Sequence, residues 1–304
     1  MGYSSWSDDA FSVLKHTRKS KATKDIFTSK SLSKDMDPKG VNFRESRDSD
    51  AHPQTVPIMV FLDVTGSMGR IPEVLVREKL GALMNTLLAH GVEGPQVLFG
   101  AIGDHITDRF PLQIGQFESG TQELDQWLTT TYLEGGGGGQ YMESYLLAWL
   151  FAARHTSTDS FEKRGQKGFL FTIGDEWTWE GIDEESLKRI MGYSNCEPVS
   201  AEELLEEAKR MYEVFHIHIN EASYRDHPKI LNPWKELLGE RLIILEDYNA
   251  IAETIASTVA VLKGSALNEV TAAFDASIAS TVSKALAKVH GDISTTSDEG
   301  ILKL

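Results

Sequence analysis

Apolar strands that alternate with helices between residues 56 and 262 constrain the fold of this chain more than any other feature. The run VPIMVFLD at 56–63 is apolar on both faces, as a central strand of a parallel sheet must be. The sequence predicts further strands at 96–104, 168–176, 214–220 and 241–247. Because strands and helices alternate over about 200 residues, we expect an α/β fold with a doubly wound, mostly parallel sheet.

Helices are expected between these strands, and one strand is expected to run against the others. Apolar residues recur at helical spacing in IPEVLVREKLGALMNTLLAH at 71–90. Ser200 and Glu203 form a capping-box pattern, and Gly264 is a typical helix stop. FPLQIGQF at 110–117 alternates apolar and polar residues, which indicates an antiparallel edge strand.

The composition changes on either side of this region, so the sequence predicts three parts. Residues 1–55 are polar and are expected to form an extended arm with one short helix near SDDAFSVLKH. Residues 56–264 form the α/β domain. In the extension 265–304, apolar residues recur every three or four positions along one helix. This stripe either packs back onto the domain or forms a seam for self-association.

Charge and cysteine content exclude several classes of protein. The formal net charge of −15 argues against a nucleic-acid binder, which neutralises phosphates with lysine and arginine. No apolar run approaches the ~18 residues of a membrane span, and MGYSSWSDDAF does not resemble a signal peptide. The single cysteine, Cys196, fits a reducing compartment. We therefore expect no membrane partner and a cytoplasmic location.

The stretch FLDVTGSMG at 61–69 carries the main chemical signal. It delivers Asp63, Thr65 and Ser67 to the end of a buried strand, where they could form a phosphoryl-transfer site, a metal site or a helix cap. A phosphatase of the haloacid-dehalogenase type needs a second carboxylate two residues after its nucleophile, and Thr65 stands there instead. GSMGR also lacks the Gly-Lys-Ser/Thr of a phosphate loop.

A metal site accounts for these residues best. One carboxylate and two hydroxyls on a tight turn suit an octahedral hard cation such as Mg²⁺ or Mn²⁺. Asp104 and Asp175 also end apolar strands, and the carboxyl ends of parallel strands meet at one edge of a sheet. An ion held by few charges stays electrophilic, and a carboxylate from a partner protein can complete its coordination.

Asp63-x-Thr65-x-Ser67 resembles the Asp-x-Ser-x-Ser signature of von Willebrand factor A domains, with threonine for the first serine. GGGQYME at 137–143 resembles a later loop in one branch of that family, Gly-Gly-Gly-Asp-x-Pro-Glu, and GDH at 103–105 resembles the end of its second strand. FTIGDE supplies the family's last strand-end acid. The resemblance covers roughly 56–262.

The resemblance implies a doubly wound fold with a metal-ion-dependent adhesion site on top of the sheet. Thr65 and Ser67 would be direct ligands, and Asp63 would act directly or through water. Gln140 stands at a ligand position without adding charge, and Asp175 is expected to act through water. Three further acids are expected to surround these ligands: Asp104, Glu143 and Glu176. Glu176 could compete as a ligand, and Asp104 could instead cap its own turn.

These inferences predict a non-enzymatic, metal-dependent protein-interaction module whose partner offers an Asp or Glu. The resemblance to stand-alone bacterial and phage members suggests AAA+ ATPases or virion and assembly components as partners. A metal-dependent hydrolase with His105 as base is one alternative. A structural subunit with a vestigial metal site is another. His216, His218 and His227 offer a zinc alternative, which lacks a further ligand at suitable spacing. Trp177 and Trp179 are expected on the rim of the site.

Overall fold

The structure is a computed structural model of the full chain. It describes residues 4–133, 135, 141–221 and 224–296, except the side chains of 67, 69 and 290–296.

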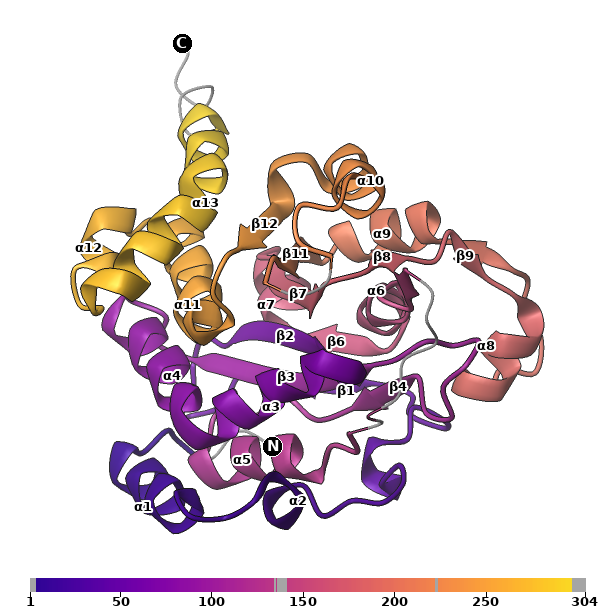
Figure 1. The fold of residues 1–304 in the computed structure, drawn as a ribbon, viewed down its shortest axis with the longest axis horizontal. Coiled ribbons are helices and arrows are strands. Elements are labelled where there is room, and N and C mark those ends of the chain that lie inside the picture. The colour runs from indigo at the N-terminus through magenta and orange to yellow at the C-terminus, as the bar shows by residue number, and fades with distance from the viewer. Residues whose placement is uncertain (1–3, 134, 136–140, 222–223, 297–304) are drawn as a thin grey trace.

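The centre of the molecule is a six-stranded sheet with the order β12-β11-β7-β2-β3-β4 (Figure 1). Its strands are β2 (Val56–Asp63), β3 (Pro95–Ile102), β4 (Leu112–Ile114), β7 (Gly168–Gly174), β11 (Tyr212–Ile219) and β12 (Leu242–Leu245). Every neighbouring pair is parallel except β3 and β4, which are antiparallel at one edge. The predicted α/β class, with a mostly parallel sheet and one antiparallel edge strand, is confirmed.

The strand order reverses its direction beside β2, and this reversal positions the candidate site. From β2 the chain proceeds to β3 and β4 on one side, then returns to β7 on the other side. Asp63 lies opposite Ile102 of β3, and Leu62 lies opposite Ile173 of β7. In doubly wound sheets, ligands bind at the carboxyl ends of the strands where the order reverses. The residues that follow β2 and β7 lie at that point.

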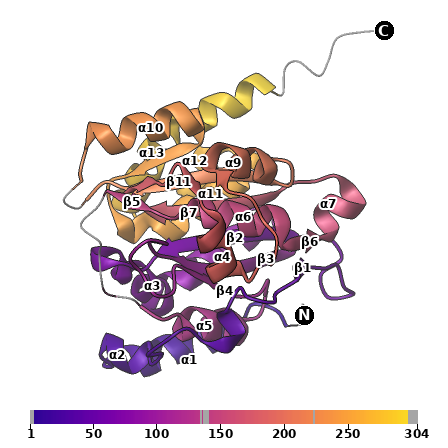
Figure 2. The ribbon, with the colours of Figure 1, turned by 90° about the vertical axis from the view of Figure 1, so that its right-hand side faces the viewer.

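Alternate residues of the central strand point to opposite faces, and each face has its own apolar core. Ile58, Val60 and Leu62 belong to one core, whereas Met59 and Phe61 belong to the other. The first face is covered by α3 (Arg70–Val74), the π-helical turn η3 (Leu75–Lys79), α4 (Leu80–Ala89), α11 (Ile251–Leu262) and α13 (Ala276–Thr296). The second is covered by α6 (Leu146–Arg154), α8 (Glu184–Met191), α9 (Ala201–Lys209) and α10 (Pro228–Leu238), as Figures 1 and 2 show. No helix in the described part of the chain is long and apolar enough to cross a membrane.

The remaining elements are short and lie around the sheet. They are η2 (Gly66–Gly69), α5 (Thr121–Thr130), β5 (Met142–Glu143), β6 (Thr156–Thr158), α7 (Asp159–Arg164), β8 (Trp177–Thr178), β9 (Gly181–Ile182), β10 (Val199–Ser200), η4 (Gly239–Arg241), η5 (Tyr248–Ala250) and α12 (Leu267–Thr271). Strands β5 and β8 form a small pair next to the candidate site. Strands β9 and β10 form another, next to a groove on the second face.

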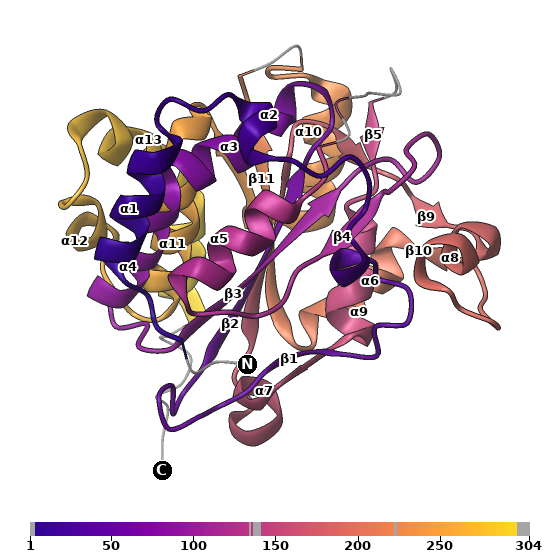
Figure 3. The ribbon, with the colours of Figure 1, turned by 90° about the horizontal axis from the view of Figure 1, so that it is seen from below.

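The segment for which the sequence predicts an extended arm packs against the domain. It contains α1 (Asp8–Arg18), α2 (Thr23–Ile26), η1 (Lys34–Met36) and β1 (Arg44–Ser46). Figure 3 shows α1 and α2 beside the helices of the first face. Phe11, Ile26 and Phe27 are buried in the first core, and Arg18 forms an ion pair with Asp125 of α5. These contacts explain why a polar segment is ordered here. The boundary at residue 55 stays a prediction.

Arg47 and Asp159 join the end of this segment to α7. Arg47 Nη1 donates to Asp159 Oδ1 at 2.9 Å, and the Asp48 amide donates to Asp159 Oδ2 at 2.9 Å. Lys163 also pairs with Asp159, at 2.6 Å. Burial by itself raises the pKa of Asp159, but hydrogen bonds from Lys163, the Asp48 amide and Arg47 outweigh it and lower the pKa to about 2. Asp159 is therefore the charged centre of this junction.

Replacement of Asp159 by asparagine is expected to lower the free energy of unfolding by about 1–3 kcal/mol at pH 7, because Arg47 and Lys163 lose their buried carboxylate. A pKa lowered in the folded state means that the carboxylate stabilises the fold above its unfolded pKa of ~4. This stabilisation is lost as the pH falls toward about 2. Urea unfolding at pH 7 and pH 3 measures the effect. Glu162→Gln, at a more exposed partner of Arg47, is the control and should cost under ~1 kcal/mol. A difference between Asp159→Asn and wild type that stays constant with pH would contradict this assignment.

The C-terminal helix covers one edge of the first core. Val282, Leu286 and Val289 are buried in the same cluster as Ile255 and Val259 of α11. Their stripe is thus occupied by the chain's own domain. The sequence left two alternatives for the extension. These three residues follow the first, because they pack back onto the domain.

Candidate metal centre

Asp63 is the innermost side chain of the candidate site. It is the last residue of β2 and is fully buried. Its Oδ1 accepts hydrogen bonds from the Thr65 amide at 2.8 Å and from Thr65 Oγ1 at 2.6 Å. Aspartate commonly bonds to backbone two residues further on, and this turn ends the strand before η2 begins. The spacing Asp-x-Thr therefore turns the chain and also orients the threonine hydroxyl.

Glu143 approaches the same turn from a distant part of the sequence. It ends β5 and lies opposite Thr178 of β8, which follows β7 closely. Glu143 Oε1 lies 3.5 Å from Thr65 Oγ1. The other oxygen, Oε2, is buried and has no hydrogen-bond partner among the described residues. A buried carboxylate oxygen without a donor is costly, and it indicates a missing positive partner.

Asp175 and Glu176 complete the acidic environment. Asp175 directly follows β7 and is nearly buried, and Glu176 is half-buried. Within the described residues, no lysine or arginine forms an ion pair with any of the five acids at or next to the strand ends, which are Asp63, Asp104, Glu143, Asp175 and Glu176. Buried charges are normally paired or bound to a metal. Among the residues that the structure describes, these acids have no lysine or arginine as an ion-pair partner.

Four of these acids, Asp63, Glu143, Asp175 and Glu176, have pKa values raised above the usual range of a carboxyl. Burial and the neighbouring carboxylates raise the pKa of Asp63 and of Glu143 well above the usual range of a carboxyl. Burial raises the pKa of Asp175 to about 6. Burial, together with Asp63 and Asp175, raises the pKa of Glu176 to about 8. A cation at this place would reverse each of these shifts.

Asp104 has a structural role that the sequence offered as one alternative. Its Oδ1 accepts from the Ile106 amide at 3.0 Å, and its Oδ2 accepts from Thr107 Oγ1 at 2.7 Å. It therefore caps its own turn. The same Oδ1 accepts from Trp179 Nε1 at 2.9 Å, which holds that indole beside the site.

Sequence reasoning missed Tyr145. This fully buried tyrosine donates its hydroxyl to Asp63 Oδ2 at 3.3 Å. It reaches Asp63 because residue 174 is a glycine: a Cβ there would lie 1.8 Å from the tyrosine oxygen. Tyr145 lies only two residues after Glu143, but nothing in the local pattern identifies it. The contact depends on how α6 packs beneath β7.

Two predicted ligands lie outside what the structure describes. Ser67 is in η2, but its side chain is not described, and neither is Gln140 or the glycine run 136–139. The structure brings Asp63, Thr65 and Glu143 together and places Asp175 and Glu176 beside them. Ser67 and Gln140 stay predictions as ligands.

The described donors fit a hard cation in kind. They are carboxylate and hydroxyl oxygens, which Mg²⁺ and Mn²⁺ prefer. Among the described residues, however, no group of three or more His, Cys, Asp or Glu side chains is arranged to hold a metal ion. An ion here therefore needs hydroxyl or amide donors as well. Thr65 is one such donor. Its hydroxyl hydrogen is donated to Asp63, so the lone pairs of its oxygen can face a cation.

The three histidines of the zinc alternative do not form such a group in the described structure either. His216 is buried between strands, stacks on Trp234 with 3.9 Å between ring centres, and contacts Thr172 Oγ1 through Nδ1. Burial lowers the pKa of His216, and it lowers that of His218 to about 4. Both are neutral core residues.

Comparison with known proteins relates the chain only to solved structures. No family model matches it, and no curated protein matches it in sequence. It is similar to proximal thread matrix protein 1 from the mussel byssus, with 9% identity and a TM-score of 0.43, over 66% of this chain and 46% of that one. It is similar to the pilus adhesin SpaC from Lactobacillus rhamnosus GG, with 10% identity and a TM-score of 0.43, over 71% of this chain and 31% of that one. A form of the mussel protein with a zinc-occupied MIDAS motif matches with 10% identity and a TM-score of 0.41, over 69% and 47%. The chain thus spans less than half the length of each protein.

Proposed function

We propose that this protein is a metal-dependent protein-interaction module that binds Mg²⁺ or Mn²⁺ where β2 and β7 end. The observation that carries the proposal is a group of buried acids that pair with no lysine or arginine of the described chain, and that include a Glu143 oxygen with no partner among the described residues. A divalent ion placed there would offset the repulsion among the carboxylates, and a water bound to the ion would give that oxygen a hydrogen-bond donor.

Asp63, Thr65, Ser67 and Gln140 would hold the ion, with Asp175 acting through water. Glu143 and Glu176 lie beside this set, and Asp104 holds the turn and Trp179 in place. The ion supplies a Lewis-acidic position for an oxygen ligand from outside. Because this ligand set carries little direct negative charge, a carboxylate of a partner protein suits that position.

The proposed partner is therefore a protein that presents an exposed Asp or Glu. From the resemblance to stand-alone von Willebrand factor A proteins, we propose an AAA+ ATPase or an assembly component in the cytoplasm of a bacterium or in a phage system. The net charge of −15 argues against nucleic acid as the partner.

The geometry favours binding over hydrolysis. A hydrolase at this site needs a base, and His105 is the base that the sequence offers. Its Nδ1 contacts Ser144 Oγ at 2.7 Å, and its ring packs edge-on against Trp179. The imidazole is buried, and its Nδ1 is engaged by Ser144. We therefore assign no catalytic residue.

Affinity capture with and without chelator tests the proposal. The tagged protein is exposed to lysate of its source in Mg²⁺ buffer or in EDTA, and bound proteins are identified by mass spectrometry. We expect a specific partner in Mg²⁺ that is lost in EDTA and with Asp63→Ala, but kept with Asp50→Ala at an exposed site. The purified partner should then lose binding when its own contacting Asp or Glu becomes alanine. Capture that is equal in EDTA, or phosphoester hydrolysis that depends on Asp63, would overturn the proposal.

A further inference from the structure

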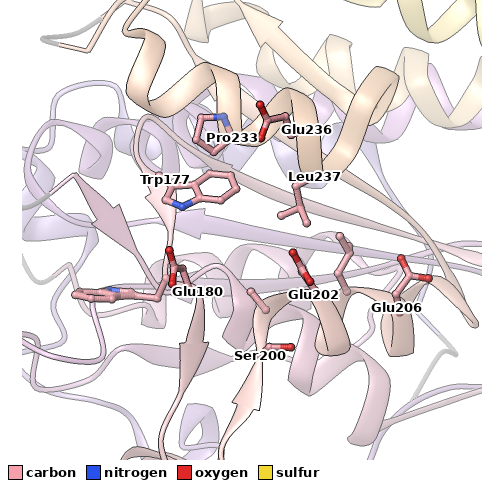
Figure 4. A pocket seen from close by; sticks show the side chains of 11 residues that line it. Trp177, Glu180, Ser200, Glu202, Glu206, Pro233, Glu236 and Leu237 are labelled. Atoms are coloured by element: carbon pink, nitrogen blue, oxygen red, sulfur yellow. The ribbon is translucent and has the colours of Figure 1, made fainter.

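A groove of about 640 Å³ lies on the second face of the molecule. Figure 4 shows the side chains that line it, among them Trp177, which directly follows Glu176 of the candidate metal centre in the sequence. Its walls are α9 on one side, α10 on the other, and the β8–β9 connection at one end. The volume lies within the ~300–1,000 Å³ of ligand-binding clefts. The groove is separate from the buried acids: its described lining residues include neither Asp63, Thr65 nor Asp175.

The floor of the groove is apolar and rigid. Trp177, Leu205 and Leu237 line it from three different elements. The Trp177 ring packs edge-on against the fully buried Trp234, with 4.8 Å between ring centres. Leu205 is itself buried in the second core. The floor is therefore preformed.

The rim of the groove is negatively charged on every side. Glu202 and Glu206 project from one face of α9, since residues four apart on a helix are neighbours. Glu236 projects from α10, and Glu180 closes the end, as Figure 4 shows. The described lining contains no lysine, arginine or histidine.

Most of this negative charge is not neutralised by the chain itself. Glu206 pairs with Lys209 at 2.7 Å in an exposed contact. Glu180, Glu202 and Glu236 form no ion pair with any other described residue. Such exposed carboxylates around an apolar floor attract cations that carry an apolar stem.

We propose that this groove is a docking site for a basic segment of a partner protein. Lysine or arginine side chains would lay their alkyl stems on the partly exposed Trp177 and Leu237, and their charged ends would meet the glutamates. An indole face adds a favourable contact with a guanidinium or ammonium group. Carboxylates on opposite walls match a segment with several charges better than a single small cation. The proposal does not depend on the metal centre.

Fluorescence anisotropy with a labelled helical peptide tests this proposal. The probe repeats lysine and leucine every three to four residues, and its control has glutamate for each lysine. We expect the lysine peptide to bind the full chain, in EDTA as in Mg²⁺, and to weaken as salt rises. The glutamate peptide should not bind.

Charge reversal on both walls locates the site. Glu202→Lys combined with Glu236→Lys is expected to weaken the lysine peptide by about tenfold or more, equivalent to ~1.4 kcal/mol. The matched control is Glu93→Lys combined with Glu240→Lys, which makes the same charge change at exposed positions outside the groove lining. It should change affinity less than ~threefold, by long-range charge alone. Circular dichroism checks that both double variants fold.

Three results would overturn the proposal: equal weakening by both double variants, equal binding of the glutamate peptide, or no binding of the lysine peptide. Displacement of the peptide by spermidine at matched concentration would also overturn it, because the occupant would then be a small polyamine. Failure of this test leaves the metal-dependent capture unaffected, since the groove shares no ligand with the ion.

Discussion

In buffer without divalent cations, the protein is expected to lose stability as the pH rises from about 5 to about 8, and Mg²⁺ at pH 8 is expected to restore it. The relevant groups are Asp63, Glu143, Asp175 and Glu176, whose pKa values are raised in the folded state, to about 6 for Asp175 and about 8 for Glu176. An acid whose pKa is raised by folding contributes to the free energy of unfolding while it is protonated, and it loses this contribution when it ionises at higher pH. That contribution is complete below the unfolded pKa of ~4 and is lost as the pH passes the folded value.

The size of this loss follows from the linkage of protonation to folding. One unit of pKa shift is ~1.4 kcal/mol, so the acids together should cost at least ~2 kcal/mol between pH 5 and pH 8. A cation that binds only the folded protein at about 100 times its dissociation constant restores ~2.7 kcal/mol. Thermal unfolding by calorimetry at pH 5, 6, 7 and 8, with EDTA or Mg²⁺, measures both effects.

The variant Asp63→Asn separates two effects of this carboxylate: its destabilisation of the metal-free fold and its role in binding Mg²⁺. The amide keeps the acceptor for Thr65 but removes a buried negative charge that repels its neighbours. We expect the variant to melt about 2–4 °C above wild type at pH 8 in EDTA, and to lose the response to Mg²⁺. Asp50→Asn at an exposed position should leave both properties unchanged. A full Mg²⁺ response in Asp63→Asn, or no Mg²⁺ response in wild type, would remove Asp63 from the metal site.

Trp234→Ala is expected to destabilise the fold severely. The indole is fully buried and contacts four other rings: Tyr145, Trp149, Trp177 and His216. Truncation of a buried tryptophan leaves a cavity and typically costs ~3–5 kcal/mol. We therefore expect the melting temperature to fall by about 10 °C.

The same indole also holds the chain next to the metal centre. Its Nε1 donates to the carbonyl of Glu176 at 2.9 Å. Trp234→Phe keeps most of the ring packing but loses this bond, so it should cost only ~1–2 kcal/mol. Trp6→Ala, at a half-buried position on the opposite face, serves as the control and should cost less than Trp234→Ala. Equal losses in the two alanine variants would show that Trp234 is not central to the second core.

The sequence could predict the sheet because local pattern and tertiary environment agree there. VPIMVFLD is apolar at every position before Asp63, and β2 is buried on both faces. The alternation in 110–117 likewise identified β4 as an antiparallel edge strand. Strand-end acids could be placed at one edge because parallel strands share a direction. Asp63 and Asp175 are therefore recognisable from sequence.

The arm and the groove could not be predicted in the same way. Residues 4–55 contain few apolar side chains, and their order depends on partners such as Asp125 and Asp159 that lie far along the chain. The spacing of Glu202 and Glu206 indicates one helix face, but not that Glu236 of α10 stands opposite. Tyr145 and Trp234 are aromatic residues at or in a helix, and their contacts depend on how the helices pack.

The sequence by itself determined the α/β class, the edge strand and the acids at the strand ends, because periodicity and chain direction are local properties. Only the tertiary structure decided that Glu143 meets Thr65, that Tyr145 holds Asp63, and that the C-terminal stripe is covered by α11. The first two of these contacts join residues that are 78 and 82 positions apart in the sequence. Such contacts depend on how the layers pack against one another, and no local pattern of residues encodes that packing.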